Sequence, residues 1–179
     1  MCNSYLGKTL ILLIGITGDT HNNLKNISKI CEIFNSLHVD LVIHTGDITL
    51  PKSLRAFKAL NSKIIGVYGN NDQEEKKDLI KTATEFDCFF YEEPYFIMLG
   101  DISFAIIHHP ELIDQEMLKI SDVIVHGHTH KHRDEILKET LVFNPGECSG
   151  LLEGKNKVGL IRTETVSYTH LTLPTIYSV

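Results

Sequence analysis

Cysteine is scarce in this sequence, and no two cysteines lie close together. The chain has four of them, Cys2, Cys31, Cys88 and Cys148, and none forms a Cys-x-x-Cys pair. A disulfide framework or a zinc knuckle needs such closely spaced pairs, so the spacing argues against both. We therefore expect a protein of a reducing compartment, the cytoplasm.

Positive charge is also in short supply. The chain has 17 lysine and arginine residues against 23 aspartate and glutamate residues, which gives a net charge of -6 at pH 7. Long nucleic acids are bound mainly through their phosphates and require a basic face, so we expect none among the partners. A small phosphorylated ligand is compatible with this charge, because metal ions can supply positive charge locally.

Long hydrophobic runs are missing as well. The aliphatic run at residues 10–14 is much shorter than the roughly 20 apolar residues that span a membrane, and no small-residue cleavage site follows it. We interpret this run as the start of a buried strand and expect no membrane partner.

The length and composition are those of one globular domain. A chain of 179 residues with 42% hydrophobic and 22% charged residues can build a sizeable core. Residues 166–179, however, resemble the translated read-through of a transposase adapter used to build sequencing libraries. We therefore expect one domain at residues 1–165 and a non-native tail at residues 166–179.

Hydrophobic periodicity indicates three strand–helix units followed by a different pattern. The expected strands of the first half are residues 10–17, 40–45 and 63–68. Asn22 or Asn23 can cap the first helix, Pro51 opens the second, and residues 73–81 form the third. Three such units in a row predict a parallel sheet with right-handed crossovers.

The second half contains strands with fewer helices between them. The expected elements are a hairpin at residues 95–99 and 102–107, a short helix at 111–119, and strands at 122–125, 136–142 and 158–161. Gly100 and Asp101 are typical of the tight turn that joins the hairpin strands. The whole pattern predicts two packed sheets with helices outside.

Polar residues follow five of the expected strands at the point where each ends. They are Asp19 and His21; Asp47; Asn70, Asn71 and Asp72; His108 and His109; and His128 and His130. On its own, the last pair is as typical of two polar residues on one face of a strand end as it is of two metal ligands. Ligands collect at the carboxyl ends of strands in open α/β sheets, so we expect these five groups to converge.

Seven of these residues carry oxygen or nitrogen donors suited to metal ions. Assigned by residue type, one ion takes Asp19, His21, Asp47 and His130, and the other takes Asp47, Asn70, His108 and His128. One ion needs about four to six ligands, so seven donors accommodate two. Asp47 stands alone at its strand end, and its two carboxylate oxygens can bridge both ions. We expect Mn²⁺, with Ni²⁺, Fe²⁺ or Zn²⁺ as alternatives.

These motifs resemble those of a known superfamily. They occur in the order Asp19-x-His21, Gly46-Asp47, Gly69-Asn70-x-Asp72, His108 and Gly127-His128-x-His130. Their order and spacing resemble the calcineurin-like metallophosphoesterases, in particular the small single-domain phosphodiesterase branch. The resemblance spans about residues 14–163 and implies an α/β fold, a four-layer α/β/β/α sandwich of two mixed sheets flanked by helices. It also implies a dinuclear site whose bridging hydroxide attacks phosphorus.

Two residues depart from the family pattern. Many relatives have histidine where this chain has Asn71, which transfers no proton and so favours leaving groups that need little protonation. His109 follows His108 where relatives usually have glycine, and it either supplies the missing acid or narrows the pocket. Asp72 is expected to orient a ligand or a loop. Asn70, Asn71, Asp72 and His109 are thus the expected catalytic residues.

Other conspicuous residues have structural interpretations. His44 and His126 are predicted to be packed, hydrogen-bonded strand residues and not ligands, and His38 and His132 to lie on the surface. The aromatic residues 89–91 favour a core or oligomer contact over a substrate platform. A homo-oligomer is therefore one of the expected alternatives.

The expected function is a metal-dependent phosphodiesterase that hydrolyses a small phosphodiester or nucleotide-like substrate. A phosphomonoesterase that uses the same site is the first alternative. A scaffold without catalysis is the second, because the retromer subunit resembles this family and has lost part of the metal chemistry. All seven donors are present here, which favours an enzyme.

Overall fold

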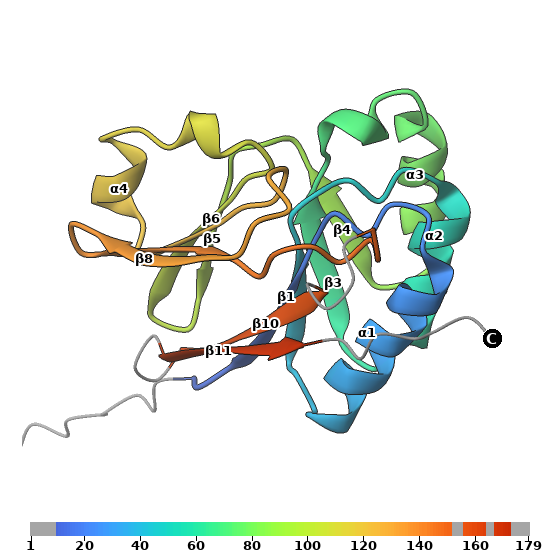
Figure 1. The fold of residues 1–179 in the computed structure, drawn as a ribbon, viewed down its shortest axis with the longest axis horizontal. Coiled ribbons are helices and arrows are strands. Elements are labelled where there is room, and N and C mark those ends of the chain that lie inside the picture. The colour runs from blue at the N-terminus through green and yellow to red at the C-terminus, as the bar shows by residue number, and fades with distance from the viewer. Residues whose placement is uncertain (1–9, 152–155, 164–166, 173–179) are drawn as a thin grey trace, which may run out of the picture.

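Two β-sheets packed face to face form the centre of the structure (Figure 1). The computed structural model describes residues 10–151, 156–163 and 167–172. The first sheet has the strand order β11-β10-β1-β2-β3-β4, and the second has the order β5-β6-β7-β9-β8. The pairs β1–β2, β2–β3 and β3–β4 are parallel, as the strand–helix units predict for the first three strands.

The elements have the following bounds. The first sheet contains β1 (Leu13–Thr17), β2 (Leu41–His44), β3 (Lys63–Val67), β4 (Cys88–Tyr91), β10 (Lys157–Arg162) and β11 (Ser167–Thr172). The second contains β5 (Tyr95–Leu99), β6 (Ile102–Ile106), β7 (Val123–Val125), β8 (Arg133–Leu137) and β9 (Thr140–Asn144). The α-helices are α1 (Leu24–Ser36), α2 (Pro51–Ala56), α3 (Lys76–Ala83) and α4 (Met117–Ile120), and 3-10 turns cover Phe57–Ala59, Asn70–Asp72 and Pro110–Leu112.

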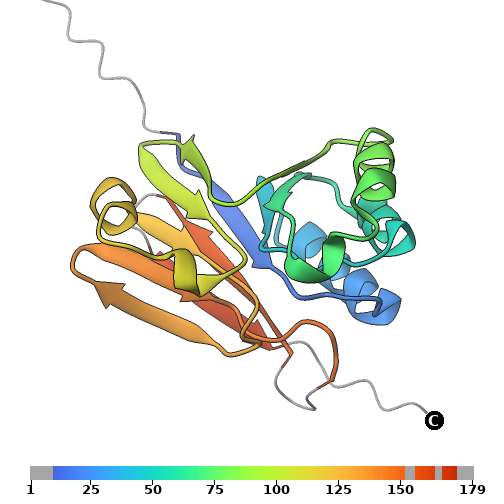
Figure 2. The ribbon, with the colours of Figure 1, turned by 90° about the horizontal axis from the view of Figure 1, so that it is seen from above.

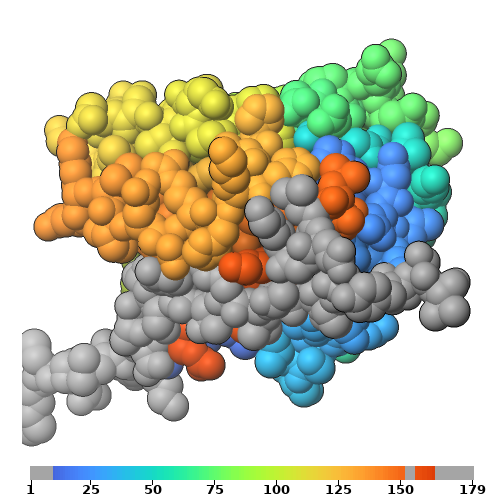
Figure 3. Space-filling view, viewed as in Figure 1, coloured from blue at the N-terminus to red at the C-terminus, as the bar shows by residue number. Residues whose placement is uncertain are grey.

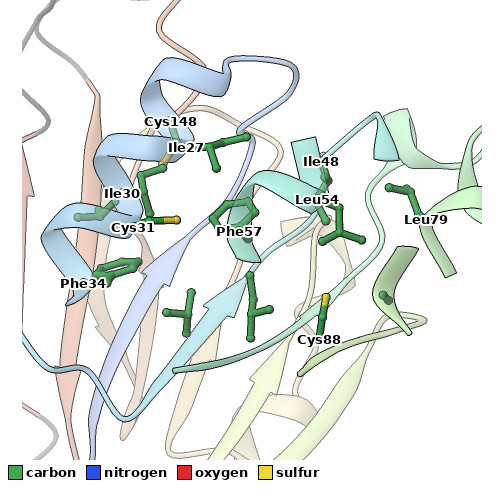
Figure 4. Close-up of a cluster of buried hydrophobic side chains, with 14 of the residues drawn as sticks. Ile27, Ile30, Cys31, Phe34, Ile48, Leu54, Phe57, Leu79, Cys88 and Cys148 are labelled. Atoms are coloured by element: carbon green, nitrogen blue, oxygen red, sulfur yellow. The ribbon is translucent and has the colours of Figure 1, made fainter. Parts of the chain in front are cut away.

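Helices cover both outer faces of the pair of sheets. One buried cluster lies between α1, α2, α3 and the first sheet (Figure 4), and a second lies between the two sheets. A third, smaller cluster packs α4 against the outer face of the second sheet. The four layers are visible from above in Figure 2. The structure therefore confirms the predicted α/β/β/α sandwich of two mixed sheets.

Helix α1 shows how local sequence determines its position. The side chain of Asn23 accepts a hydrogen bond from the Asn26 N–H and so caps the first turn. Ile27, Ile30 and Phe34 recur at helical spacing and are fully buried against the first sheet. This packing places the loop between β1 and α1 directly beside the site described below.

The aromatic residues 89–91 belong to a strand that the sequence analysis did not predict. They lie in β4, which pairs in parallel with β3 and forms one edge of the first sheet. Phe90 packs against the first core cluster, whereas Phe89 and Tyr91 are exposed. The run is short and carries no alternation of polar residues, so periodicity alone gave no signal for a strand.

The expected single strand at residues 136–142 is wrong. The chain reverses at Lys138 and Glu139, and β8 and β9 form an antiparallel hairpin on either side of them. Lys138 has a φ of 60°, a conformation that turn-forming Asn and Gly adopt more readily. The turn therefore lacks the residues that would have predicted it.

Several predicted boundaries also shift. Residues 10–12 precede β1 instead of belonging to it, and α3 starts at Lys76, three residues later than expected, after a 3-10 turn at residues 70–72. The helix expected at 111–119 is divided into a 3-10 turn and the four-residue α4.

Part of the predicted non-native tail forms β11. Ser167–Thr172 pairs antiparallel with β10 at the edge of the first sheet. An unpaired edge strand accepts an extended segment of many sequences through backbone hydrogen bonds. The pairing therefore leaves the origin of residues 166–179 untested, and that expectation stays a prediction about the gene.

The segment after β9 closes over the start of α1. The side chains of Asn23 and Asn26 donate to the carbonyl oxygens of Ser149 and Cys148, at 2.7 and 2.9 Å. Figure 3 shows this orange-red segment against the blue one.

Cys31, Cys88 and Cys148 are free and buried, whereas Cys2 lies outside the described residues. No helix among the described residues is long and apolar enough to cross a membrane.

Candidate metal centre

The loops that follow β1, β2, β3, β6 and β7 meet at one edge of the sandwich. They bring together the side chains of all seven predicted donors, Asp19, His21, Asp47, Asn70, His108, His128 and His130. Asp19, Asp47 and His108 form the buried floor of this site, and Asn70 and His128 form an exposed rim. The site therefore has a buried floor and is exposed to solvent at the Asn70 and His128 rim.

Asp19, His21 and His130 form the first group of donors. The Nε2 atoms of His21 and His130 face each other at 3.3 Å. The Oδ1 atom of Asp19 lies 3.7 Å from His130 Nε2, and Oδ2 of Asp47 lies 3.9 Å from His21 Nε2. Two imidazole nitrogens and two carboxylates thus point at one small volume.

Asn70, His108 and His128 form the second group. The Oδ1 atom of Asn70 lies 2.9 Å from His108 Nε2 and 3.0 Å from His128 Nδ1. The Oδ1 atom of Asp47 lies 3.6 Å from His108 Nε2. Since its other oxygen faces His21, Asp47 lies between the two groups.

Hydrogen bonds hold the donors in these orientations. The Nδ1 atom of His108 lies 2.9 Å from the carbonyl oxygen of Thr45, which keeps the proton on Nδ1 and the lone pair on Nε2. The His128 N–H lies 3.1 Å from each carboxylate oxygen of Asp19. Asn71 donates its backbone N–H to Oδ1 of Asp47 at 2.9 Å and its side-chain amide to Oδ2 at 2.6 Å.

The loop backbones adopt an uncommon conformation. Asp19, His21, Asp47, His128 and His130 have φ angles between 43° and 68°, a region that residues other than glycine rarely enter. Such conformations persist only where the surrounding structure enforces them, and they cluster at functional sites.

At two motif positions, no residue larger than glycine fits without a clash. A Cβ atom on Gly69 would lie 2.2 Å from Oδ1 of Asp47, and one on Gly127 would lie 2.8 Å from Oδ2 of Asp19. Both glycines therefore allow the backbone to approach a buried carboxylate.

Asp72 anchors the loop that carries Asp47. Its fully buried carboxylate accepts hydrogen bonds from the backbone N–H groups of Asp47, Ile48, Thr49 and Gly69, at 2.7 to 3.0 Å. Burial raises the pKa of Asp72, whereas the bonds from Gly69 and Thr49 lower it. The predicted orienting residue thus contacts two of the five motif loops.

The electrostatics of the site call for a cation. Burial, and to a smaller extent repulsion from Asp47, raises the pKa of Asp19 from 3.8 to about 8. Burial also lowers the pKa values of His108 and His130, so both rings are neutral near pH 7 and offer lone pairs. Buried carboxylates next to neutral imidazoles fit divalent cations, which would offset the carboxylate repulsion.

The family model of the calcineurin-like phosphoesterase superfamily domain matches residues 12–166. The chain belongs to this superfamily of hydrolases. It is 38% identical to phosphodiesterase MJ0936 of Methanocaldococcus jannaschii over 165 residues, which cover 89% of this chain and 98% of that protein. It is also 28% identical to the probable metallophosphoesterase MJ0623 of the same organism, over 79% of this chain and 69% of that protein.

Solved structures support the same assignment. An archaeal phosphodiesterase that is 38% identical superposes with a TM-score of 0.78 and covers 90% of this chain and 100% of its own. Yfce, a phosphoesterase from E. coli, is 19% identical, has a TM-score of 0.69 and covers 91% of this chain and 100% of its own. The latter likeness concerns the fold alone.

His44 lies in a strand as predicted, whereas His126 directly follows its strand, and the two predicted surface histidines are exposed. His44 is buried in β2; its Nδ1 accepts from the Gly46 N–H at 3.2 Å, and its Nε2 lies 3.0 Å from Thr20 Oγ1. His126 is buried after β7, and burial lowers its pKa to about 4. His38 and His132 are exposed.

Glu93 is a site residue that the sequence analysis missed. Its carboxylate accepts hydrogen bonds from the backbone N–H groups of His108 and His109, at 2.6 and 3.0 Å. It lies between β4 and β5, far from any motif in the sequence. Because the strand at residues 88–91 was not predicted, the sequence did not indicate that Glu93 lies near the site.

We predict that Asp72→Asn weakens metal binding as well as folding. The amide offers one acceptor oxygen where the carboxylate accepts four N–H groups, so unfolding should become easier by about 1–3 kcal/mol. Metal affinity should fall about 10- to 100-fold, because Asp47 loses its anchor. Chemical denaturation and calorimetric metal titration measure both. Unchanged metal affinity in a destabilised variant would contradict this role.

We also predict a pH effect in the metal-free protein. The pKa of Asp19 is raised from 3.8 to about 8 in the folded chain. Between about pH 4 and pH 8, the folded chain therefore keeps a proton that the unfolded chain has already released. The protonated form of Asp19 stabilises the folded chain fully at pH values below the unfolded-state pKa. This stability is lost as pH rises through the folded-state pKa. Asp19→Asn should therefore be more stable than wild type at about pH 8, with a smaller difference near pH 5. Thermal melts with a chelator present test this, and an equal difference at both pH values would refute it.

Proposed function

We propose that this chain is a phosphodiesterase that uses two divalent ions to hydrolyse a small phosphodiester or a nucleotide-like substrate. The observation that carries the proposal is the position of Asp47, with one oxygen toward His21 and the other toward His108. The relative that is 38% identical carries the name phosphodiesterase, which supports the diester class.

The proposed ligands divide as the two groups do. Asp19, His21, Asp47 and His130 would hold one ion, and Asp47, Asn70, His108 and His128 would hold the other. When bound, two divalent ions supply a water of lowered pKa as the nucleophile and positive charge for the phosphoryl oxygens. The chain itself fixes the donors, excludes water from the floor of the site and leaves the Asn70 and His128 side open to substrate.

The proposed ions follow from the donor types. Carboxylate and amide oxygens suit Mn²⁺, and imidazoles suit Ni²⁺, Fe²⁺ and Zn²⁺, so we propose Mn²⁺ first and the others as alternatives. We also propose the reducing cytoplasm as the location, which agrees with three free, buried cysteines among the described residues.

The proposed role of Asn71 is to hold Asp47 rather than to protonate a leaving group. Its side-chain amide already donates to Oδ2 of Asp47 at 2.6 Å. An amide transfers no proton, so the enzyme should favour diesters whose leaving groups are weak bases. Asp72 acts one step further away, through the backbone of the Asp47 loop.

We predict that the purified chain hydrolyses bis-p-nitrophenyl phosphate when Mn²⁺ or Ni²⁺ is added. Asp47→Ala and His128→Ala should abolish turnover while the circular dichroism spectrum stays native, because each removes a donor at the centre or rim of the site. His38→Ala is the matched control, since His38 is an exposed histidine that precedes β2, at the end of that strand opposite to Asp47. Its turnover should equal that of wild type.

The same preparation separates the alternatives. Faster turnover of p-nitrophenyl phosphate than of the diester would identify a phosphomonoesterase. A folded chain that binds the ions but turns over neither ester would be a scaffold. Turnover that survives both substitutions would end the proposal.

A further inference from the structure

His109 lies beside the second group of donors and is held by Glu93. Its Nδ1 atom lies 2.5 Å from Oε1 of Glu93, while its own N–H and that of His108 bond to Oε2. The Glu93 side chain is 17% exposed and the His109 side chain 33%. One carboxylate therefore fixes both the backbone and the ring of His109.

This contact selects one form of the imidazole ring. With the Nδ1 proton donated to a carboxylate, the lone pair of His109 remains on Nε2. A histidine that binds metal commonly donates its other N–H to a carboxylate or to a backbone carbonyl, which orients the ring and makes the free nitrogen more basic. His108 has the second kind of partner in Thr45, and His109 has the first in Glu93.

The ring of His109 also lies within reach of the ion proposed at His108 and His128. One ring nitrogen from each of these three histidines lies within 4.8 Å of the others. The ring centroid of His109 lies 4.6 Å from that of His128 and 4.8 Å from that of His108. Three imidazoles therefore converge, and two of them, His108 and His128, also contact the Asn70 amide.

We propose that His109, positioned by Glu93, is an additional ligand of this second ion. The inference rests on the proposed two-ion site and extends its ligand set with a residue outside the five motifs. It assigns His109 a role other than acid catalysis, because the ring contributes a lone pair and not a proton. Glu93 is a positioning residue that acts through His109.

A third imidazole has a consequence for the choice of metal. Imidazole donors suit Ni²⁺ and Zn²⁺, whereas carboxylate, carbonyl and water oxygens suit Mn²⁺. The added ring should therefore raise the affinity of the second site for Ni²⁺ more than for Mn²⁺. It should also fill a coordination position that water or substrate would otherwise take.

The test is a metal titration of wild type, His109→Gly, Glu93→Gln and the control His38→Ala. Calorimetry with Ni²⁺ and with Mn²⁺ gives the affinity of each site, and visible absorption of the Co²⁺-loaded protein reports the ligand set. We expect His109→Gly to weaken one Ni²⁺ site by at least 10-fold, to weaken Mn²⁺ less, and to change the Co²⁺ spectrum. Glu93→Gln should lower the Ni²⁺ affinity of the same site by about 10- to 100-fold.

Two comparisons keep the outcomes distinct. If His109→Gly keeps the wild-type Ni²⁺ affinities and Co²⁺ spectrum while Asp47→Ala loses both ions, the role of His109 is refuted and the two-ion site stands. If Asp47→Ala also binds both ions normally, the proposed site itself fails. A native circular dichroism spectrum in Glu93→Gln, with the Ni²⁺ shift present, supports positioning over a general loss of structure.

Discussion

The buried carboxylates of Asp19 and Asp47 are the constraint on which the rest of the site depends. They lie in one small volume with His21, His108 and His130, and burial, together with repulsion between them, raises the pKa of Asp19 to about 8. A protein that only had to fold would gain by replacing them with apolar residues. Their presence beside the neutral rings of His108 and His130 is therefore best explained by divalent cations, the cofactors of this superfamily.

The fold delivers these groups through backbone geometry. Two sheets present the carboxyl ends of five strands at one edge, and the loops after β1, β2 and β7 turn at residues with positive φ. Asp72 connects the loops after β2 and β3, and Asn71 holds both oxygens of Asp47. The hydrogen bonds thus offset local strain and keep the carboxylate of Asp47 between the two groups of donors.

Much of this arrangement could be predicted from local sequence. Helical spacing located α1, a Gly-Asp turn located the β5–β6 hairpin, and the strand-end motifs identified seven donors that do converge. The missed features depend on contacts distant in sequence or on turns without turn residues. Lys138 and Glu139 turn the chain without glycine or asparagine, and Glu93 reaches His109 only because β4 carries it there. Periodicity does not report such contacts.

The central proposal is that Asp47 joins two ions in one site. Electron paramagnetic resonance of the chain loaded with Mn²⁺ tests it most directly, because two ions that share a carboxylate are close enough for their spins to couple. We expect two Mn²⁺ ions per chain with a spin-coupled spectrum. The spectrum of isolated Mn²⁺, at one ion per chain in saturating metal, would contradict it.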